Sequence, residues 1–530
     1  MAAVGRRPML DMDFPPSQPL DMSAITGQHP NPSVPSDLTH ISFNVPFNSN
    51  LAGPSLEDIL YASSTQKSLE RWVHPEGTSE DTPANKLPVH TANLTALRKQ
   101  CERLATEPSG PAPVQASVIA FEPKHEPSLR RPRKGLVTNV CLSGPDSVVR
   151  KARGQILRSS PIMISAIVDV EVKHLIDVST NSAYAHSIEE LDLIAQHAGV
   201  DIFLLSPKPV DGSSRAADGG PATGIDDRLR VAIYGDVESV EVARTRILIM
   251  IDKLMGMNVD AERAEVTMHP MIAGRARRNI TMIEAMTETQ IYLPYPFSGA
   301  FGYVPSGLDR QERERLDQIF ITGKPENIAK AQLKLREISS RLKLFSKTIS
   351  LSPAKIDSII LDRMSKIRKT MERNATHVQL PPLGSQSSMI RVQGMEGVHI
   401  ERTCREIMVM AGQFYSASWW VSPMTPVPTD IKAPSAVDTR TTLSDVCVSS
   451  GAELSYDKST FSICGSDESV RWALSVLHAV KYTTRTPYQI RVKLELAQEH
   501  KEFVSGKKNG KINKIMSQSK LTIVFHSLLG

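Results

Sequence analysis

Five segments of the chain repeat one pattern of apolar and polar positions. A short alternating stretch is followed by a glycine and then by apolar residues at helical spacing. In four segments a valine or isoleucine follows the glycine at +5, an alanine at +8 and a large apolar residue at +12; these glycines are Gly144, Gly235, Gly323 and Gly465. The three offsets lie on one stripe of a helix. The pattern therefore predicts a strand, a glycine turn and a helix packed on a sheet.

The fifth copy lies at Gly394, where the apolar positions fall one residue later. The last three glycines are 71 residues apart, which indicates the length of the basic unit. The earlier spacings are longer, and the excess falls in two Gly/Ser/Pro-rich stretches, 210–224 and 296–307. Such stretches favour extended surface loops.

A second piece precedes the strand–glycine–helix pattern. It is clearest in 264–294 and 347–381, where an alternating strand is followed by a short helix, a turn, a second helix and a strand that ends in Leu-Pro. Residues 490–525 follow the same order. The complete unit therefore has the order β-α-α-β-β-α.

This order, with a G-x-x-G turn between the first two helices, resembles the type I KH domain. The tandem arrangement over roughly 90–530 resembles the multi-KH proteins of the vigilin and bicaudal-C kind, and a fungal relative is expected. The resemblance implies an α+β fold of tandem type I KH-like units, several of them degenerate. It also implies single-stranded RNA as a partner, because the KH turn holds the backbone of about four nucleotides.

We expect an N-terminal region and six units, numbered in chain order. The expected segments are a disordered region over 1–88, a degenerate unit over 89–158, a unit with a loop insertion and no G-x-x-G over 159–256, a unit with a GRAR turn over 257–343, a KH-like unit over 344–421, a partial unit over 422–484 and an incomplete unit with a GKKN turn over 485–530.

The N-terminal region has eight prolines in its first fifty residues and few large apolar groups. Ordering it would cost chain entropy without enough burial to offset that cost, which predicts disorder over most of 1–88. One local exception is expected at Leu56, Ile59 and Leu60, which share one face of a short helix that docks on another part of the protein.

The candidate RNA-binding turn of the sixth unit is the segment GKKNG. Glycine lets a backbone approach a phosphate closely, the next helix offers unpaired N–H groups, and lysines add positive charge. Asparagine stands at the place of the second glycine and tolerates left-handed backbone angles. The candidate residues are Gly506, Lys507, Lys508, Asn509, Gly510, Lys511 and Lys514. A solvated lysine turn beside an ordinary amphipathic helix is the alternative.

The third unit carries a second version of this turn, GRAR. Its candidate residues are Gly274, Arg275, Arg277 and Arg278. Arginines bind phosphates, but Arg277 replaces the second glycine, and we expect this to move the backbone away. The fourth unit has no glycine at 361–364, the second has a polar, acidic segment there, and the first and fifth lack a recognisable turn. Phosphate binding is not expected in these four units.

Other chemistry is not predicted. The segment GKKNGK lacks the spacing and the Ser/Thr of a P-loop, and no catalytic constellation, cofactor site or metal site is recognisable. Five cysteines are scattered without a CxxC pair, which favours a reducing compartment. No apolar run approaches the ~18 residues that span a membrane, and no signal peptide is recognisable. We expect a cytoplasmic protein that is not an enzyme.

Two functions fit these patterns. The first is binding of single-stranded RNA, in particular mRNA, in post-transcriptional regulation, and the net charge of +5 is compatible with an anionic partner. The second is a protein-interaction scaffold of degenerate KH folds with little or no RNA binding. The repeat also calls for a third strand and a helix after 525, and the sequence ends at Gly530, so we expect the sixth unit to be incomplete.

Overall fold

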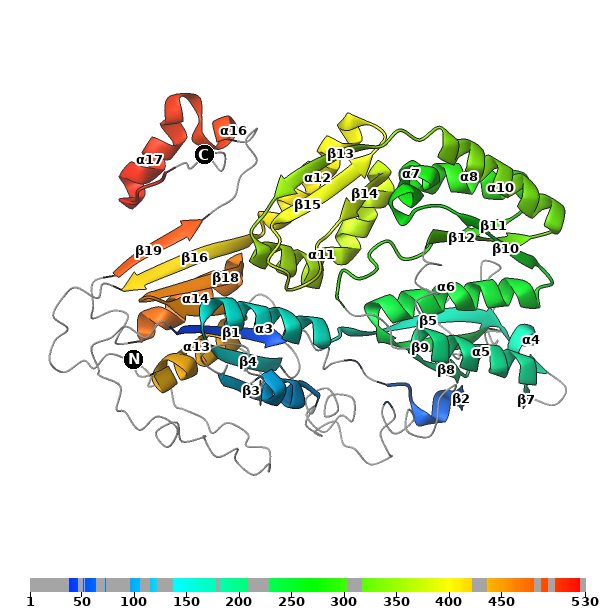
Figure 1. Ribbon diagram of the computed structural model, residues 1–530, viewed down its shortest axis with the longest axis horizontal. Coiled ribbons are helices and arrows are strands. Elements are labelled where there is room, and N and C mark those ends of the chain that lie inside the picture. Colours follow the sequence, from blue (N-terminus) through cyan, green and yellow to red (C-terminus); the bar gives the residue numbers. More distant parts are fainter. Residues whose placement is uncertain are drawn as a thin grey trace, which may run out of the picture.

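The computed structural model is a chain of KH-like units, in which three-stranded antiparallel sheets carry helices (Figure 1). The structure describes residues 38–45, 51, 53–62, 72, 96–104, 115–121, 137–177, 182–207, 228–302, 317–421, 436–480, 488–493 and 501–524. The loop expected over 210–224 lies outside them. Within the described residues, no helix is both long enough and apolar enough to cross a membrane.

The third unit has every element of the predicted order. Its elements are β10 (Asn258–Arg263), α7 (His269–Ala273), the 3-10 turn η5 (Arg275–Arg277), α8 (Arg278–Thr287), β11 (Gln290–Tyr292), β12 (Gln318–Gly323) and α10 (Pro325–Ser340). The strands are antiparallel in the order β10-β12-β11, so the last strand lies in the middle. Ile280 of α8, Ile321 of β12 and Ile328 of α10 meet in the core.

The fourth unit keeps this sheet but not the turn. Its elements are β13 (Phe345–Ser350), α11 (Pro353–Asn374), β14 (Thr376–Gln379), β15 (Met389–Gly394) and α12 (Gly397–Ala411). One continuous helix, α11, replaces the two helices and the turn that we expected. The reason is local, because 361–364 contains neither glycine nor proline. Ile360, Met364 and Ile367 also continue one buried stripe through this segment.

The second unit has the KH sheet order with one added strand. Its elements are β5 (Met163–Glu171), α4 (Val172–Leu175), β6 (Ile176–Asp177), β7 (Ser182–Ala183), α5 (Ala185–Ala198), β8 (Asp201–Leu205), β9 (Arg228–Asp236) and α6 (Val237–Leu254). The added strand β2 (Ile59–Ala62) pairs with β8 at the sheet edge. Trp72 is buried against Phe203 and Tyr234 on the sheet.

The first and fifth units share one seven-stranded sheet, joined by a strand of the sixth unit. The strands in spatial order are β19 (Tyr488–Lys493), β16 (Phe414–Val421), β18 (Thr460–Ser466), β17 (Glu453–Asp457), β1 (Thr39–Val45), β4 (Val137–Gly144) and β3 (Gln115–Phe121). The first unit supplies β1, β4 and β3, and the fifth supplies β16, β18 and β17. Each set of three has the order of the third unit's sheet.

Helices cover both faces of this sheet. The first unit contributes α3 (Asp146–Ser159), and the fifth contributes α13 (Ala436–Ser450) and α14 (Asp467–Ala479). Phe43 of β1 packs in the core that contains Val149 and Ile156 of α3. The neighbouring Asn44 donates a hydrogen bond to the carbonyl of Cys447 in α13, at 3.3 Å. Since successive residues of a strand point to opposite faces, α3 and α13 lie on opposite sides of β1.

These strands revise the expected boundaries. Residues 39–45 lie in the part of 1–88 that we expected to be disordered, and β1 is the first strand of the first unit. Ile41 and Phe43 supply the alternating apolar side chains that the proline-rich composition obscured. Leu56 begins a single 3-10 turn, η2 (Leu56–Asp58), which leads into β2 in place of the expected helix. Likewise, β16 belongs to the fifth unit because it pairs with β18.

The strand–glycine–helix pattern predicted the packing face of each last helix. The side chains at +5, +8 and +12 are all at most 4% exposed in four units: Val149, Ala152, Ile156, Val240, Ala243, Ile247, Ile328, Ala331, Leu335, Val470, Ala473 and Leu477. The glycine itself allows close packing. A Cβ on Gly235 would lie 2.9 Å from Val200 Cγ1, and one on Gly465 would lie 3.2 Å from Ser469 Cβ.

The stretch 296–307 was expected to be a surface loop, but its described part, 296–302, is packed between units. Phe297 is 3% exposed and belongs to a core with residues of the first and fourth units. The backbone N–H of Gly299 donates to Glu238 of α6 at 3.0 Å. Aromatic side chains at this place pack where glycine and proline alone would indicate a solvated loop.

Candidate nucleic-acid interface

The turn of the third unit has an unusual backbone path. Gly274 lies at φ 72°, ψ 173°, Ala276 at φ 52°, ψ 38°, and Arg277 at φ 60°, ψ 15°. The last two are left-handed conformations that residues other than glycine adopt rarely. The helix α8 begins at the next residue, so its first N–H groups face the turn.

The turn of the sixth unit follows the same path. Its elements are α16 (Lys501–Ser505), η8 (Lys507–Asn509) and α17 (Gly510–Ser519). Gly506 lies at φ 73°, ψ 172°, Lys508 at φ 53°, ψ 37°, and Asn509 at φ 59°, ψ 21°. The corresponding angles of the two turns agree within a few degrees. Arg277 and Asn509 at the place of the second glycine therefore give the same backbone path.

The first glycine is required in both turns. Its angles lie in a region that is essentially restricted to glycine. A Cβ on Gly274 would also lie 2.7 Å from Asn279 Cγ, and one on Gly506 would lie 2.8 Å from Lys511 Cγ. The turn conformation thus depends on a glycine at the first position and tolerates other residues at the last.

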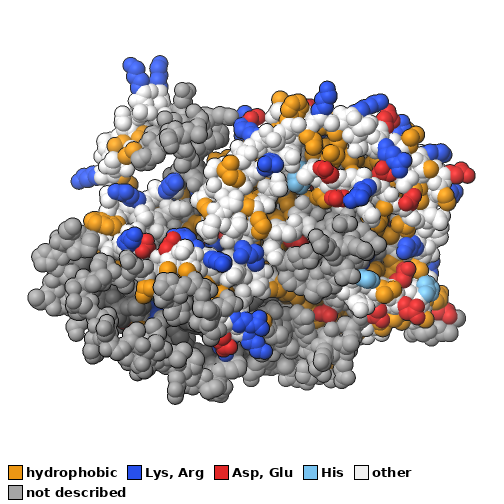
Figure 2. Space-filling view, viewed as in Figure 1, with side chains coloured by type: hydrophobic (Ala, Val, Ile, Leu, Met, Phe, Trp, Pro, Cys, Tyr) orange, Lys and Arg blue, Asp and Glu red, His pale blue; other side chains and the backbone are white. Residues whose placement is uncertain are grey.

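Two lysines of the sixth unit project freely from the turn. Lys507 and Lys508 are exposed, and neither side chain forms a hydrogen bond or an ion pair with another described residue. Figure 2 shows basic side chains extending from the region of η8 and α17 at the upper left of the view. Lys514 is exposed as well. Lys511 instead turns back, donating to the carbonyl of Phe503 at 3.1 Å with its Nζ 4.7 Å from that ring.

The arginines of the third unit are more engaged. Arg275 is exposed, and its Nε donates to the carbonyl of Arg373 at the end of α11, at 3.4 Å. Arg277 lies against its own unit, where Nη2 donates to the carbonyl of Ile291 at 3.2 Å. Arg278 is exposed. Of the predicted arginines, Arg275 and Arg278 are thus the ones directed to solvent.

The other units differ at the place of the turn. The fourth has the continuous helix α11, and the second has α4 and the short strands β6 and β7. Neighbouring segments also occupy several edges of the sheets: β2 pairs with β8, β1 pairs with β17, and α7 of the third unit contacts β14 of the fourth. These edges serve the assembly of the units.

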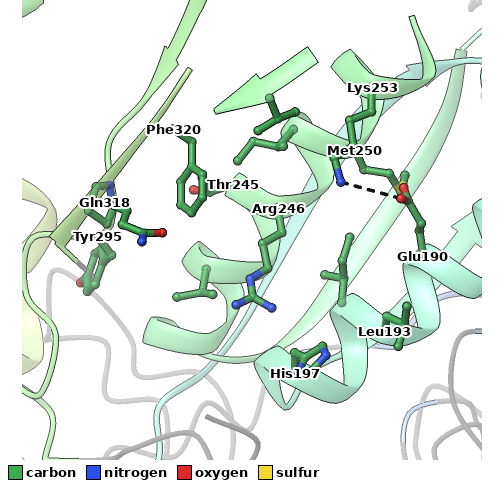
Figure 3. Close-up of a pocket in the computed structure, with 15 residues that line it drawn as sticks. Glu190, Leu193, His197, Thr245, Arg246, Met250, Lys253, Tyr295, Gln318 and Phe320 are labelled. Carbon is green, nitrogen blue, oxygen red and sulfur yellow. Dashed lines mark ion pairs between the residues drawn. The ribbon is translucent and has the colours of Figure 1, made fainter. Parts of the chain in front are cut away.

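A cavity of about 410 Å³ lies between the second and third units. Figure 3 shows Tyr295, Gln318 and Phe320 of the third unit on one side, with Arg246 and His197 of the second unit across from them. Phe320 lies between Ile319 and Ile321, which belong to the core of the third unit, so it points to the opposite face of β12. The cavity is therefore on the sheet face away from the helices that hold the turn.

Sequence reasoning missed the partners of these turn residues. Glu284 accepts from the backbone N–H of Ile291 at 3.0 Å and lies 3.5 Å from Arg277 Nη2. The ring of Phe503 contacts the ammonium group of Lys511. A signal for the first contact exists, because Glu284 follows Arg277 by seven residues, which is two helical turns.

Three segments match family models of KH domains. Residues 256–343 match the KHD4 second KH domain, and residues 346–415 match the Mug60/KHD4 KH type I domain. Residues 485–528 match the YLL032C fifth KH domain-like family. The fold and the turns thus define tandem KH domains of type I.

Matches to whole relatives extend further along the chain. The K homology domain-containing protein 4 of Mycosarcoma maydis is 35% identical over 408 residues, which cover 73% of this chain and 28% of the relative. The meiotically up-regulated gene 60 protein of Schizosaccharomyces pombe is 21% identical over 520 residues, 81% of this chain and 76% of the relative. Vigilin of Mus musculus is 24% identical over 282 residues, 53% of this chain and 19% of the relative.

This chain is a multi-KH-domain protein of the fungal type. It spans little more than a quarter of the length of the Mycosarcoma maydis relative. KH domains are nucleic-acid-binding modules, so these matches support nucleic-acid binding in general.

Proposed function

We propose that this protein binds single-stranded RNA and that the turn of the sixth unit is its main contact with the phosphate backbone. One observation carries the proposal. Gly506 to Asn509 reproduce the backbone angles of the third unit's turn, and Lys507 and Lys508 extend from it without partners among the described residues. The charge needed for a phosphate is thus held on an ordered backbone and is not used elsewhere.

The start of α17 adds to this site. The first N–H groups of a helix have no partner within the helix, and they lie at the positive end of its dipole. Gly510 begins α17 directly after the turn, and a Cβ at this position would meet no atom within 4 Å. The Gly510 N–H itself donates to the Lys507 carbonyl, and a phosphate has room to approach the start of α17 between the two lysines.

The third unit is the second proposed contact, through Arg275 and Arg278. Two weak sites on one chain raise each other's effective concentration, so the loss of one site weakens binding without abolishing it. The wider proposal is that the RNA is mRNA and that the protein acts after transcription in the cytoplasm. The five free cysteines are compatible with a reducing compartment.

A titration with labelled, random-sequence single-stranded RNA at two salt concentrations tests the main site. We expect Lys507→Asp/Lys508→Asp to weaken binding about tenfold or more and to reduce the salt slope by about 1.4, since each phosphate contact on a single strand contributes about 0.7. Lys330→Asp/Lys343→Asp is the matched control, because both lysines are exposed on another surface of the third unit. An unchanged affinity and slope in the first variant would refute the site.

A second candidate function is a protein-interaction scaffold with little RNA binding. The pairing of β2 with β8 and of β1 with β17 favours it, since segments of this chain already bind KH sheet edges. The same titration separates the two functions. A scaffold would bind RNA weakly, with an affinity equally insensitive to both pairs of substitutions.

A further inference from the structure

The edge of β11 in the third unit is closed by two side chains. Glu284 of α8 accepts from the backbone N–H of Ile291 at 3.0 Å, and Arg277 donates to the carbonyl of the same residue at 3.2 Å. The arginine and the glutamate also contact each other at 3.5 Å. An edge strand normally leaves such groups unpaired and ready to bind another molecule. Here both polar groups of Ile291 already have partners.

The conformation of the turn does not require an arginine at this place. Arg277 has φ 60°, ψ 15°, a left-handed conformation that glycine or asparagine adopts more easily. A side chain that contacts phosphate would be expected to extend into solvent, and Arg278 is exposed in this way. The Arg277 side chain is 41% exposed. The side chain instead crosses from the turn to β11. Its position is thus explained by the contacts with Ile291 and Glu284.

The sixth unit provides an internal comparison. Counting from the first glycine of each turn, Asn509 corresponds to Arg277 and Met516 corresponds to Glu284. Both residues of the pair are replaced together, although the backbone of the turn is the same. Asparagine and methionine cannot form the ion pair. The sixth unit therefore keeps the turn without this closure.

We propose that Arg277 and Glu284 form a clasp that holds the β11 edge of the third unit closed, and that single-stranded RNA engages this unit fully only when the clasp opens. The inference rests on the proposed RNA-binding function and concerns its regulation. A nucleobase presents hydrogen-bond donors and acceptors on its edges, so it competes with the clasp for the N–H and C=O of Ile291. The closed clasp also keeps the Glu284 carboxylate beside the path of an anionic strand.

The clasp lowers the RNA affinity of the third unit. Two hydrogen bonds of ordinary net strength must be exchanged before a base reaches Ile291, which corresponds to about a tenfold weaker affinity. Arg275 and Arg278 remain accessible on the turn. We therefore expect weak phosphate contact in the closed state and tighter binding in the open state.

The experiment transfers the pair of the sixth unit to the third. The starting protein is the full chain with Lys507→Asp/Lys508→Asp, so that the RNA affinity reports the third unit. Arg277→Asn/Glu284→Met is then added, and labelled random-sequence single-stranded RNA is titrated. We expect the affinity to rise about tenfold. The control is Glu337→Met/Arg341→Asn, which removes another arginine–glutamate pair, joined at 2.8 Å near the end of α10, and is expected to change nothing.

A milder variant covers the case in which the double substitution perturbs the sheet. Glu284→Gln keeps an oxygen that accepts from the Ile291 N–H but removes the charge that holds Arg277. We expect it to raise the affinity about threefold, with unchanged hydrogen exchange of β12. An unchanged or lower affinity in both the double variant and Glu284→Gln would overturn the clasp. A loss of affinity in the double variant, with Glu284→Gln unchanged, would identify Arg277 as a phosphate ligand instead.

Failure of the clasp and failure of the proposed function give different results. If Lys507→Asp/Lys508→Asp weakens binding but the added substitutions raise nothing, the clasp is wrong and the RNA-binding site stands. If the unaltered chain binds RNA no better than the lysine variant, the proposed site itself is wrong.

Discussion

At the scale of single residues, the two turns differ from a G-x-x-G motif only at the last glycine. Arg277 and Asn509 occupy that place with φ values of 60° and 59°. A left-handed conformation costs a residue other than glycine about 1 kcal/mol, and less for asparagine, whose side chain bonds locally. The helix that begins at the next residue holds the turn in this conformation. A missing second glycine is therefore a weak reason to dismiss a KH turn in this chain.

The first glycine leads to a direct prediction. Gly506→Ala places a Cβ at φ 73°, ψ 172° and 2.8 Å from Lys511 Cγ, which we expect to cost about 1–3 kcal/mol. The turn should then lose hydrogen-exchange protection over 501–519, and the RNA affinity should fall. Hydrogen exchange with mass spectrometry and RNA titration measure the two effects.

Gly510→Ala is the matched control within the same unit. Gly510 has helical angles and open space around it, so alanine should leave the turn intact and stabilise α17 by roughly 0.5–1 kcal/mol. Equal losses of protection in both variants would contradict the explanation, since strain at Gly506 would then not be the cause.

At the scale of elements, local patterns predicted the helices that close each unit. The stripes at +5, +8 and +12 are buried because each last helix packs on the sheet of its own unit. The order of elements in the third unit was also predicted from local patterns of apolar residues. Its turn was also found from the sequence, because glycine and charge lie within a few residues of each other.

Contacts over long sequence distances were not predictable in this way. The strand β1 lies about 95 residues before its partner β4 and is surrounded by proline-rich sequence, so composition outweighed three alternating apolar residues. The continuous helix α11 follows from the absence of a glycine, but the repeat template argued for a turn. The contacts of Arg277 with Ile291 depend on how a turn faces a strand, which residue spacing alone does not determine.

The position of β1 predicts that one substitution in this strand destabilises two units. Phe43 is 2% exposed in the core of the first unit, and β1 also pairs with β17 of the fifth. Phe43→Ala should cost about 3–5 kcal/mol by opening a cavity. We expect faster hydrogen exchange in both β4 and β17. Leu60→Ala in β2 is the control, because Leu60 is 51% exposed. Faster exchange in β4 alone would mean that β1 does not couple the two units.

At the scale of the whole molecule, buried charges and an inserted loop join the units. Arg153 of the first unit forms ion pairs of 2.6 Å with Asp357 of the fourth and with Glu453 of the fifth. The cost of removing such charges from water offsets much of their attraction, so these pairs are weak evidence for stability. Glu238 of the second unit accepts from the backbone of the loop 296–302. Figure 1 shows α16 and α17 apart from this assembled body, which leaves the lysine turn accessible in the arrangement that the other units hold.

The Glu238 junction makes the stability of the assembly depend on pH. Burial raises the pKa of Glu238 to about 7, and the N–H groups of Gly299 and Phe301 oppose this shift only in part. The nearby Asp236 raises it further. A carboxyl whose folded pKa lies above its unfolded value binds an extra proton in the folded state. Its contribution is therefore complete below about pH 4.5 and is lost as the pH rises through about 7.

Glu238→Gln isolates this contribution from other titrating groups. Burial lowers the pKa of His269 to about 4 and lowers that of His377, so these histidines favour the folded state as the pH rises and oppose the effect of Glu238. Subtracting the two proteins removes their contribution. We expect the difference in the free energy of unfolding between Glu238→Gln and the unaltered chain to shift in favour of Glu238→Gln from pH 5 to pH 8. The shift is about 1.4 kcal/mol per pH unit at most. Parallel pH profiles would mean that Glu238 keeps an ordinary pKa, and that solvent reaches the junction between α6 and the loop.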